Sequence, residues 1–122
     1  MTTQDVADDL VAMWKAGDFA GSGEKYWAED AVSIEPVAPN GGDPVARGKA
    51  ALRGKGEWWA GAHDVHGVEV EGPFVNGDRF VVRFKMDVTQ KDSGQRFVMD
   101  ETALYTIKDG KIAEEAYFYN GM

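Results

Sequence analysis

The stretch FVMDETALYTI, residues 97–107, alternates between two sets of side chains and so predicts a β-strand. Successive side chains of a strand point to opposite faces, so one face carries Phe97, Met99, Glu101, Ala103, Tyr105 and Ile107. That face is apolar except for the carboxylate of Glu101. Burying an unpaired charge costs free energy or forces its pKa to shift. We therefore expect Glu101 to line a cavity.

Further strands fill the C-terminal half of the chain. Alternation and turn residues predict strands over 66–74, 79–89, 96–107 and 111–119, with tight hairpin turns at Asn76-Gly77 and Asp109-Gly110. In the second of these strands, five large apolar side chains share a face: Phe80, Val82, Phe84, Met86 and Val88. We expect this row to face the helices, with Phe84 among the residues that contact a ligand.

The N-terminal half is mainly helical. Apolar periodicity predicts helices over 3–16, about 22–28 and 48–61, a short strand over 31–35 and a loop over 39–44. Thr3 and Ser22 are the expected N-caps of the first two helices. The order of elements predicts a single α+β domain over residues 1–122, with the helices on one face of a curved antiparallel sheet. Such a sheet, with helices across its mouth, encloses a pocket.

The composition excludes several classes of function. The chain of 122 residues has a formal net charge of −8, with 21 acidic and 13 basic side chains. A phosphate backbone or an anionic membrane would repel it, so we expect neither nucleic acid nor membrane as a partner. The chain has no cysteine, which excludes disulfides and thiolate metal ligands. With no leader segment recognisable, we expect a cytoplasmic location.

Five short motifs, in this order and spacing, resemble the SnoaL-like families of the nuclear transport factor 2 superfamily. They are Ala16-Gly17-Asp18, Trp27-Ala28-Glu29-Asp30-Ala31, Glu35-Pro36-Val37, Arg47-Gly48-Lys49-Ala50-Ala51-Leu52 and Asp109-Gly110-Lys111-Ile112. The resemblance implies a cone-like α+β fold with three helices across the concave face of the sheet. It also implies a homodimer that holds small, largely apolar ligands inside the cone.

The ketosteroid isomerases of this superfamily provide a residue-by-residue test. By resemblance, their general base corresponds to Glu35, which is kept as a carboxylate. Their two oxyanion-hole donors correspond to Leu10 and a position near Ala103, and neither side chain can donate a hydrogen bond. The resemblance therefore supports a base at Glu35 and argues against a true ketosteroid isomerase.

Glu35 and Glu101 are the candidate catalytic residues, and each has a structural alternative. Glu35 would take and return a proton if it lies partly desolvated in the cone, or would lie at the rim in water or in a salt bridge. Glu101 would donate a hydrogen bond if burial keeps it protonated, or would pair with an Arg or Tyr for structural reasons.

The candidate ligand-binding residues are mostly aromatic. Trp14, Trp58 and Trp59 are expected to wall the pocket or to seal the helices onto the sheet. His66 shares strand parity with the expected inner face, as a wall residue or a proton carrier. In the last strand, the resemblance places Glu115 and Tyr117 inside the cone, whereas the pattern alone favours the face of Glu114.

These observations predict a pocket protein that binds a small organic molecule and that catalyses acid–base proton transfer in an isomerisation, cyclisation or dehydration. Such chemistry requires no cofactor, and we expect no metal site, because the pattern His63, Asp64 and His66 is nonspecific. The alternative is a non-catalytic ligand carrier or a dimerising accessory domain. Inner carboxylates paired one-to-one with Arg79, Arg83 or Arg96 would favour that alternative.

Overall fold

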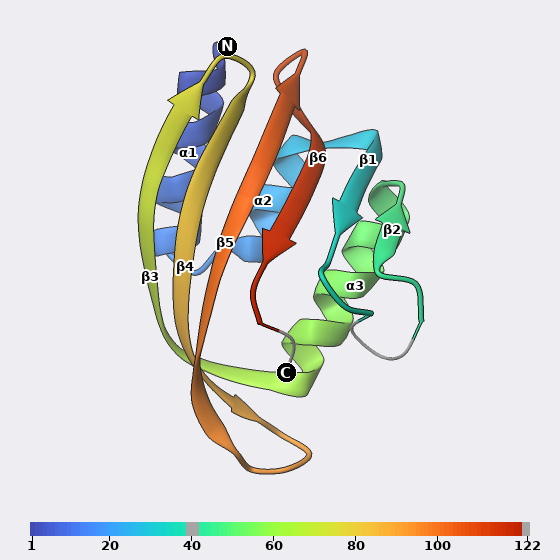
Figure 1. The fold of residues 1–122 in the computed structure, drawn as a ribbon, viewed down its shortest axis with the longest axis vertical. Helices are drawn as coiled ribbons and strands as arrows, with labels where there is room; N and C mark the ends of the chain where they lie inside the picture. The colour runs from blue at the N-terminus through green and yellow to red at the C-terminus, as the bar shows by residue number, and fades with distance from the viewer. Residues whose placement is uncertain (39–41, 121–122) are drawn as a thin grey trace.

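Three helices and six strands make up the described part of the chain. The structure, a computed structural model, describes residues 1–38 and 42–120 (Figure 1). The elements are α1 (Thr3–Lys15), α2 (Phe19–Tyr26), β1 (Trp27–Ile34), β2 (Val45–Arg47), α3 (Lys49–Ala62), β3 (His63–Asn76), β4 (Arg79–Gln90), β5 (Arg96–Lys108) and β6 (Lys111–Phe118). Residues 39–41 of the predicted loop lie outside the described residues. The α+β class, the three helices and the four long C-terminal strands are as predicted.

The strands form one curved sheet in the order β2-β1-β6-β5-β4-β3, with the helices on its concave face (Figure 1). The strands from β3 to β6 are antiparallel neighbours, but β1 runs parallel to β6, with Ser33 opposite Glu115. The sheet is therefore mixed, and the prediction of a wholly antiparallel sheet is wrong. The reason is that β1 lies between two strands: it pairs with β2, which follows it in the sequence, and also with β6, the last strand. The strand β2 was not predicted.

The helix starts differ from the predicted caps. Thr2, not Thr3, caps α1: its hydroxyl accepts from the Asp5 amide at 3.1 Å, and the Asp5 carboxylate accepts from the Thr2 amide at 3.0 Å. Asp18, not Ser22, caps α2, so this helix begins earlier than predicted. Ser22 instead lies buried inside α2 and accepts a hydrogen bond from Trp14 Nε1 at 3.0 Å.

The main core lies between α1 and the inner face of the sheet. The predicted inner row of β4 is buried along its whole length: Phe80, Val82, Phe84, Met86 and Val88. From α1, Trp14 packs edge-on against Phe84 with ring centroids 5.1 Å apart. Tyr105 of β5 stacks on Phe80, also at 5.1 Å. Burial of these aromatic side chains joins the first helix to the middle of the sheet.

The outer face of the sheet combines ion pairs with exposed apolar side chains. Arg83 forms a two-pronged pair with Asp100, and Arg96 forms another with Asp87. Among large apolar side chains, Phe74, Val98 and Phe118 are more than half exposed. Both arginines therefore find acidic partners within the same chain, on the outer face.

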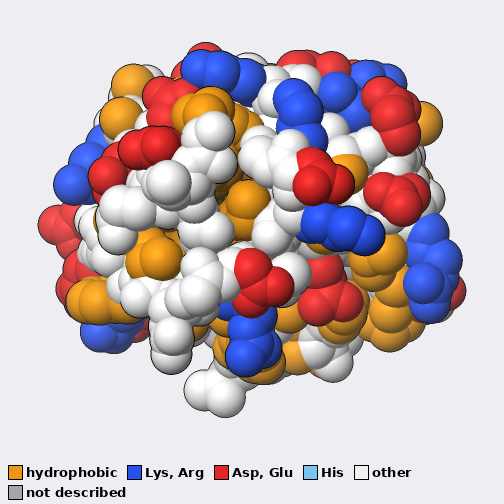
Figure 2. Space-filling model, turned by 90° about the horizontal axis from the view of Figure 1, so that it is seen from above, with side chains coloured by type: hydrophobic (Ala, Val, Ile, Leu, Met, Phe, Trp, Pro, Cys, Tyr) orange, Lys and Arg blue, Asp and Glu red, His pale blue; other side chains and the backbone are white. Residues whose placement is uncertain are grey.

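Figure 2 looks onto the end of the molecule where the N-terminus and the β3–β4 and β5–β6 turns lie. Acidic and basic side chains are interspersed there around smaller areas of hydrophobic surface. No helix within the described residues combines the length and apolar character needed to cross a membrane.

Candidate functional site

A polar cluster lies on the inner face of the sheet, beside the apolar core under α1, and Tyr105 belongs to both. It gathers side chains from β1, α3, β5, β6 and the residues that follow β1 and β6. Its members are Trp27, Ser33, Glu35, Lys55, Glu101, Tyr105, Glu115, Tyr117 and Tyr119. Because β1 and β5 both flank β6, side chains far apart in the sequence meet over this strand. The cluster thus brings the two predicted catalytic residues, Glu35 and Glu101, into one electrostatic environment.

Glu115 is the best-satisfied member of the cluster. It is 4% exposed, and its carboxylate accepts three hydrogen bonds, from Trp27 Nε1 at 2.7 Å, Ser33 Oγ at 3.0 Å and Tyr117 OH at 2.6 Å. A buried carboxylate is stable only when donors replace its water, and these three donors do so. Glu115 therefore organises the cluster around it.

Glu35 is held at one oxygen and free at the other. Its side chain is 12% exposed, and Oε1 lies 2.9 Å from Lys55 Nζ. Its Oε2 is buried without a hydrogen-bond partner among the described residues. Lys55 also donates to Ser33 Oγ at 2.6 Å, and its ammonium lies 5.1 Å from the ring centroid of Tyr117. The structure therefore shows Glu35 in a salt bridge, in a position that shields it from bulk water.

Glu101 has a strongly perturbed pKa. Burial, and then the negative charge of Glu35, raise the pKa of Glu101 from 4.5 to about 7, with Lys55 acting in the opposite direction and Glu115 adding to the rise. Burial also raises the pKa of Tyr105 and Tyr117 well above the ordinary value, with the charge of Glu115 as the next cause. The cluster at neutral pH thus contains neutral phenols and one carboxyl group poised between its two protonation states.

The structure places the other predicted ligand-binding residues outside this cluster. Trp14 and Phe84 belong to the apolar core. Trp58 is 45% exposed on α3, and Trp59 stacks on His63 with ring centroids 4.5 Å apart. Trp14 therefore seals α1 onto the sheet, the second of the two expected roles, and contact of these aromatic rings with a ligand stays a prediction.

His66 lies on the wrong face for the predicted role. It is exposed, and its Nε2 lies 2.7 Å from Thr89 Oγ1. The register of β3 against β4 shifts between Val65 and Gly67, so His66 is the extra residue of a bulge. A bulge reverses strand parity, which explains why alternation counted back from Val68 fails here.

A second bulge explains the ambiguity of the last strand. The pairing of β5 with β6 shifts between Thr106 and Ile107, so that Ile112 and Glu115 are both buried although their sequence spacing is odd. Glu114 is exposed. The placement implied by the family resemblance, with Glu115 and Tyr117 turned inward, agrees with the structure, and simple alternation does not.

Five members of the cluster are not among the predicted site residues: Trp27, Ser33, Lys55, Tyr105 and Tyr119. Lys55 is the charged residue among them. A signal for it exists in the sequence, because Lys55 follows the buried Leu52 by three residues and precedes the half-buried Trp59 by four. Residues at these spacings share one face of a helix. A lysine within such an apolar row is the helical counterpart of Glu101 within its strand.

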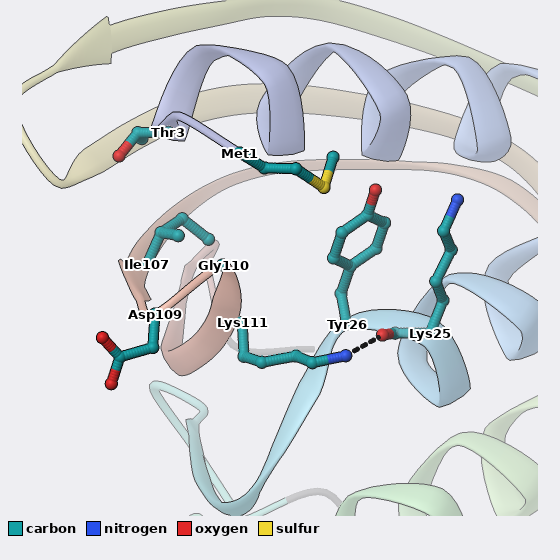
Figure 3. Close-up of a pocket in the computed structure, with 8 residues that line it drawn as sticks. All are labelled: Met1, Thr3, Lys25, Tyr26, Ile107, Asp109, Gly110 and Lys111. Atoms are coloured by element: carbon teal, nitrogen blue, oxygen red, sulfur yellow. Dashed lines mark hydrogen bonds between the residues drawn. The ribbon is translucent and has the colours of Figure 1, made fainter.

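Two surface pockets lie away from the two glutamates. One of about 570 Å³ is at the N-terminal end, where Lys111 Nζ donates to the Lys25 carbonyl at 2.8 Å (Figure 3). The other, of about 550 Å³, is lined by His63, Gln90, Gln95, Phe97 and Val98. A cavity that touches both Glu35 and Glu101 stays a prediction. In residues 1–38 and 42–120, no group of three or more His, Asp or Glu side chains has an arrangement that could hold a metal ion.

Comparison with known proteins gives the same fold. A protein of Mesorhizobium loti, described as a candidate SnoaL-like polyketide cyclase, is 51% identical, with 98% of this chain and 100% of that chain covered and a TM-score of 0.92. A candidate isomerase of Bacillus subtilis is 20% identical over 98% of this chain and 90% of that chain, with a TM-score of 0.80.

The description of a more distant structure names the fold. A Catenulispora acidiphila protein with a ketosteroid isomerase-like fold, solved with trimethylamine, is 15% identical over 90% of this chain and 81% of that chain, with a TM-score of 0.70. No curated protein matches this chain. The model of the SnoaL-like domain matches residues 1–119, which is nearly the whole chain. The chain therefore belongs to the family of SnoaL-like domains.

Proposed function

We propose that the protein catalyses acid–base proton transfer on a small, largely apolar organic molecule, in an isomerisation, cyclisation or dehydration. The observation that carries the proposal is the pairing of two glutamates with different environments in one cluster. Glu35 is paired with an ammonium group and its other oxygen has no hydrogen-bond partner within residues 1–38 and 42–120, whereas Glu101 has a pKa of about 7. A carboxylate beside a carboxyl group of raised pKa is the arrangement that separates a base from an acid.

The two glutamates have complementary roles in this proposal. Glu35 Oε2 takes a proton from a carbon next to a carbonyl group, and the C–H electron pair forms a carbon–carbon double bond. Glu101 gives its proton to the carbonyl oxygen, which forms an enol. Where the substrate has a further carbon–carbon double bond conjugated with the enol, Glu35 returns the proton to the far carbon of the resulting dienol. Glu101 takes back the enol proton as the carbonyl group re-forms, which completes an isomerisation and restores both groups.

The relative from Mesorhizobium loti supports this class of reaction, because it is 51% identical to this chain and is described as a candidate cyclase. The phenol groups of Tyr105 and Tyr117, which burial keeps neutral, suit a site for an uncharged organic molecule. Arg83 and Arg96 pair with aspartates on the outer face and not with the inner carboxylates. In a non-catalytic carrier we expect arginines paired one-to-one with the inner carboxylates, and these two arginines do not form such pairs.

The full satisfaction of Glu115 favours a second candidate function, ligand binding without catalysis. Three donors occupy its carboxylate, as in a structural polar core. Such a protein would use the same cluster to orient a ligand without exchanging protons with it. The two functions differ in one measurable property, the exchange of carbon-bound hydrogen.

Hydrogen exchange at the carbon next to a ketone tests the proposal without knowledge of the natural substrate. The probe is 2-tetralone in D2O, with deuterium uptake followed by NMR. We expect exchange above the buffer rate, and a loss of about a hundredfold in Glu35→Gln and Glu101→Gln. Glu114→Gln is the matched control, because Glu114 is exposed. Exchange at the buffer rate with 2-tetralone and with other enolisable ketones of similar size would support the binding protein instead.

We also propose a homodimer that uses the outer face of the sheet, and a cytoplasmic location. The exposed Phe74, Val98 and Phe118 support the dimer, since a second copy of the chain would remove this apolar surface from water. Because the arginines of this face already have partners in their own chain, contact between apolar side chains is the expected driving force. The absence of cysteine supports the location.

A further inference from the structure

Lys55 connects two residues of the cluster, Glu35 and Ser33. Its ammonium lies 2.9 Å from Glu35 Oε1 and 2.6 Å from Ser33 Oγ. The Lys55 side chain is 23% exposed, whereas Ser33 is fully buried. Since an ammonium group has three donors, Lys55 can hold Glu35 and Ser33 at the same time.

The hydrogen bonds through Ser33 have a defined direction. Lys55 donates to Ser33 Oγ, so the Ser33 hydroxyl is free to donate its proton to Glu115 Oε2, at 3.0 Å. Tyr117 donates to the same oxygen of Glu115 at 2.6 Å. The ammonium of Lys55 is thereby held from two sides, by a carboxylate directly and by a second carboxylate through a serine.

We propose that Lys55 is a positioning residue: it binds Oε1 of Glu35, leaves Oε2 as the atom that takes a proton, and offsets the negative charge that Glu35 and Glu115 place beside Glu101. This inference rests on the proposed function only in treating Glu35 Oε2 as the base of the reaction. The charges of Glu35 and Glu115 both favour the protonated form of Glu101, and without an opposite charge they would hold its proton too tightly for transfer. The ammonium of Lys55 weakens that hold, so that Glu101 can give up its proton near neutral pH.

Other ionisable groups face Glu101 and enter its titration. They come from β5, from β6 and from the residues after β1 and β6, and they are Glu35, Tyr105, Glu115 and Tyr119. The two glutamates raise the pKa of Glu101, and Lys55 lowers it. The tyrosines stay neutral, because burial raises the pKa of each above its ordinary value. Lys55 is thus the group whose removal should move the titration of Glu101 furthest upward.

The test is the carboxyl titration of Glu101, followed by NMR of the ligand-free protein labelled with 13C in glutamate. We expect a midpoint near pH 7 in the wild-type protein, as the pKa of about 7 requires. In Lys55→Met the midpoint should rise by roughly one pH unit or more, and Lys55→Arg should restore it. Lys49→Met is the matched control on the same helix, because Lys49 contacts Glu24 outside the cluster. An unchanged midpoint in Lys55→Met would overturn the inference.

A second measurement covers the case in which Lys55→Met does not fold. In the wild-type protein, the 15N signal of the Lys55 ammonium should shift with pH at the midpoint of Glu101, and Glu101→Gln should abolish that shift. A Lys55 signal that does not respond near pH 7 would also overturn the inference. If the titrations behave as expected but 2-tetralone does not exchange, the proposed function fails and the effect of Lys55 on the titration of Glu101 stands.

Discussion

Replacing Glu101 with glutamine should make the protein more stable at high pH. The glutamine amide has nearly the shape of the carboxyl group and carries no charge. The folded protein resists ionisation of Glu101, because its carboxyl group is buried and lies near Glu35. The substitution therefore removes a charge that the fold accommodates only at a cost.

The size and sign of the effect follow from the pKa of Glu101. Each tenfold change in proton affinity corresponds to about 1.4 kcal/mol, so a rise of the pKa from 4.5 to about 7 destabilises the folded state by roughly 3 kcal/mol when the group is ionised. Between 4.5 and about 7 the unfolded chain has lost this proton and the folded chain keeps it. The free energy of unfolding should therefore fall as the pH rises through this range, and this contribution should be constant above it.

Urea unfolding of the wild-type protein and of Glu101→Gln, across this range of pH, measures the effect. We expect the variant to be more stable by roughly 3 kcal/mol at about pH 8, and the difference to vanish at about pH 4. Glu114→Gln is the control for loss of a charge on the surface, since Glu114 is exposed. A variant less stable than the wild type at pH 8, or a difference that does not grow with pH, would show that Glu101 is one half of a structural pair.

Three further predictions concern the rest of the fold. Glu115→Ala should cost roughly 3 kcal/mol or more in urea unfolding, because three buried donors lose their acceptor, and a loss below about 1 kcal/mol would contradict this. Val98→Glu, at an exposed apolar residue of the outer face, should convert a dimer into a monomer in sedimentation at micromolar concentration, and a monomeric wild-type protein would refute the proposed interface. Thr2→Ala should lower stability by about 1 kcal/mol, whereas Thr3→Ala should change it by less than about 0.5 kcal/mol. Equal effects at the two threonines would contradict the assigned cap.

The sequence predicts the core of the sheet well, and the reason is regularity. From Phe80 to Val88 the chain pairs with β5 without a shift of register, so alternate residues keep the same face throughout. Every apolar residue of the predicted inner row is buried. In the same way, Val6, Leu10 and Trp14 recur with helical spacing and form the buried face of α1. Where no residue interrupts the repeat, the spacing of apolar residues alone predicts which side chains are buried.

The same reasoning fails across bulges. His66 lies at a register shift in β3, and Glu115 follows one between β5 and β6. In each case a single extra residue reverses the faces on one side of it, so a correct strand assignment still gives a wrong face. The bulge between β5 and β6 lies close to the Asp109-Gly110 turn, and His66 precedes Gly67, but neither feature determines which residue is the extra one. The pairing partner determines where the extra residue lies, and that partner is distant in the chain.

Glu101, which the sequence analysis predicted, and Lys55, which it did not, share one sequence signal. Each is a charged residue within an apolar row: Glu101 in the strand of residues 97–107, and Lys55 between Leu52 and Trp59 on α3. A charge retained in such a row requires an opposite charge or a proton, and here Lys55 has Glu35 while Glu101 holds a proton near neutral pH. The strand signal was visible because six alternate residues define the row. The helix signal was obscured by Gly54 and Gly56, which weaken the apolar periodicity on either side of Lys55. A charged residue that takes an apolar position of a helix therefore indicates a candidate site residue, as in a strand, even where glycines interrupt the helix.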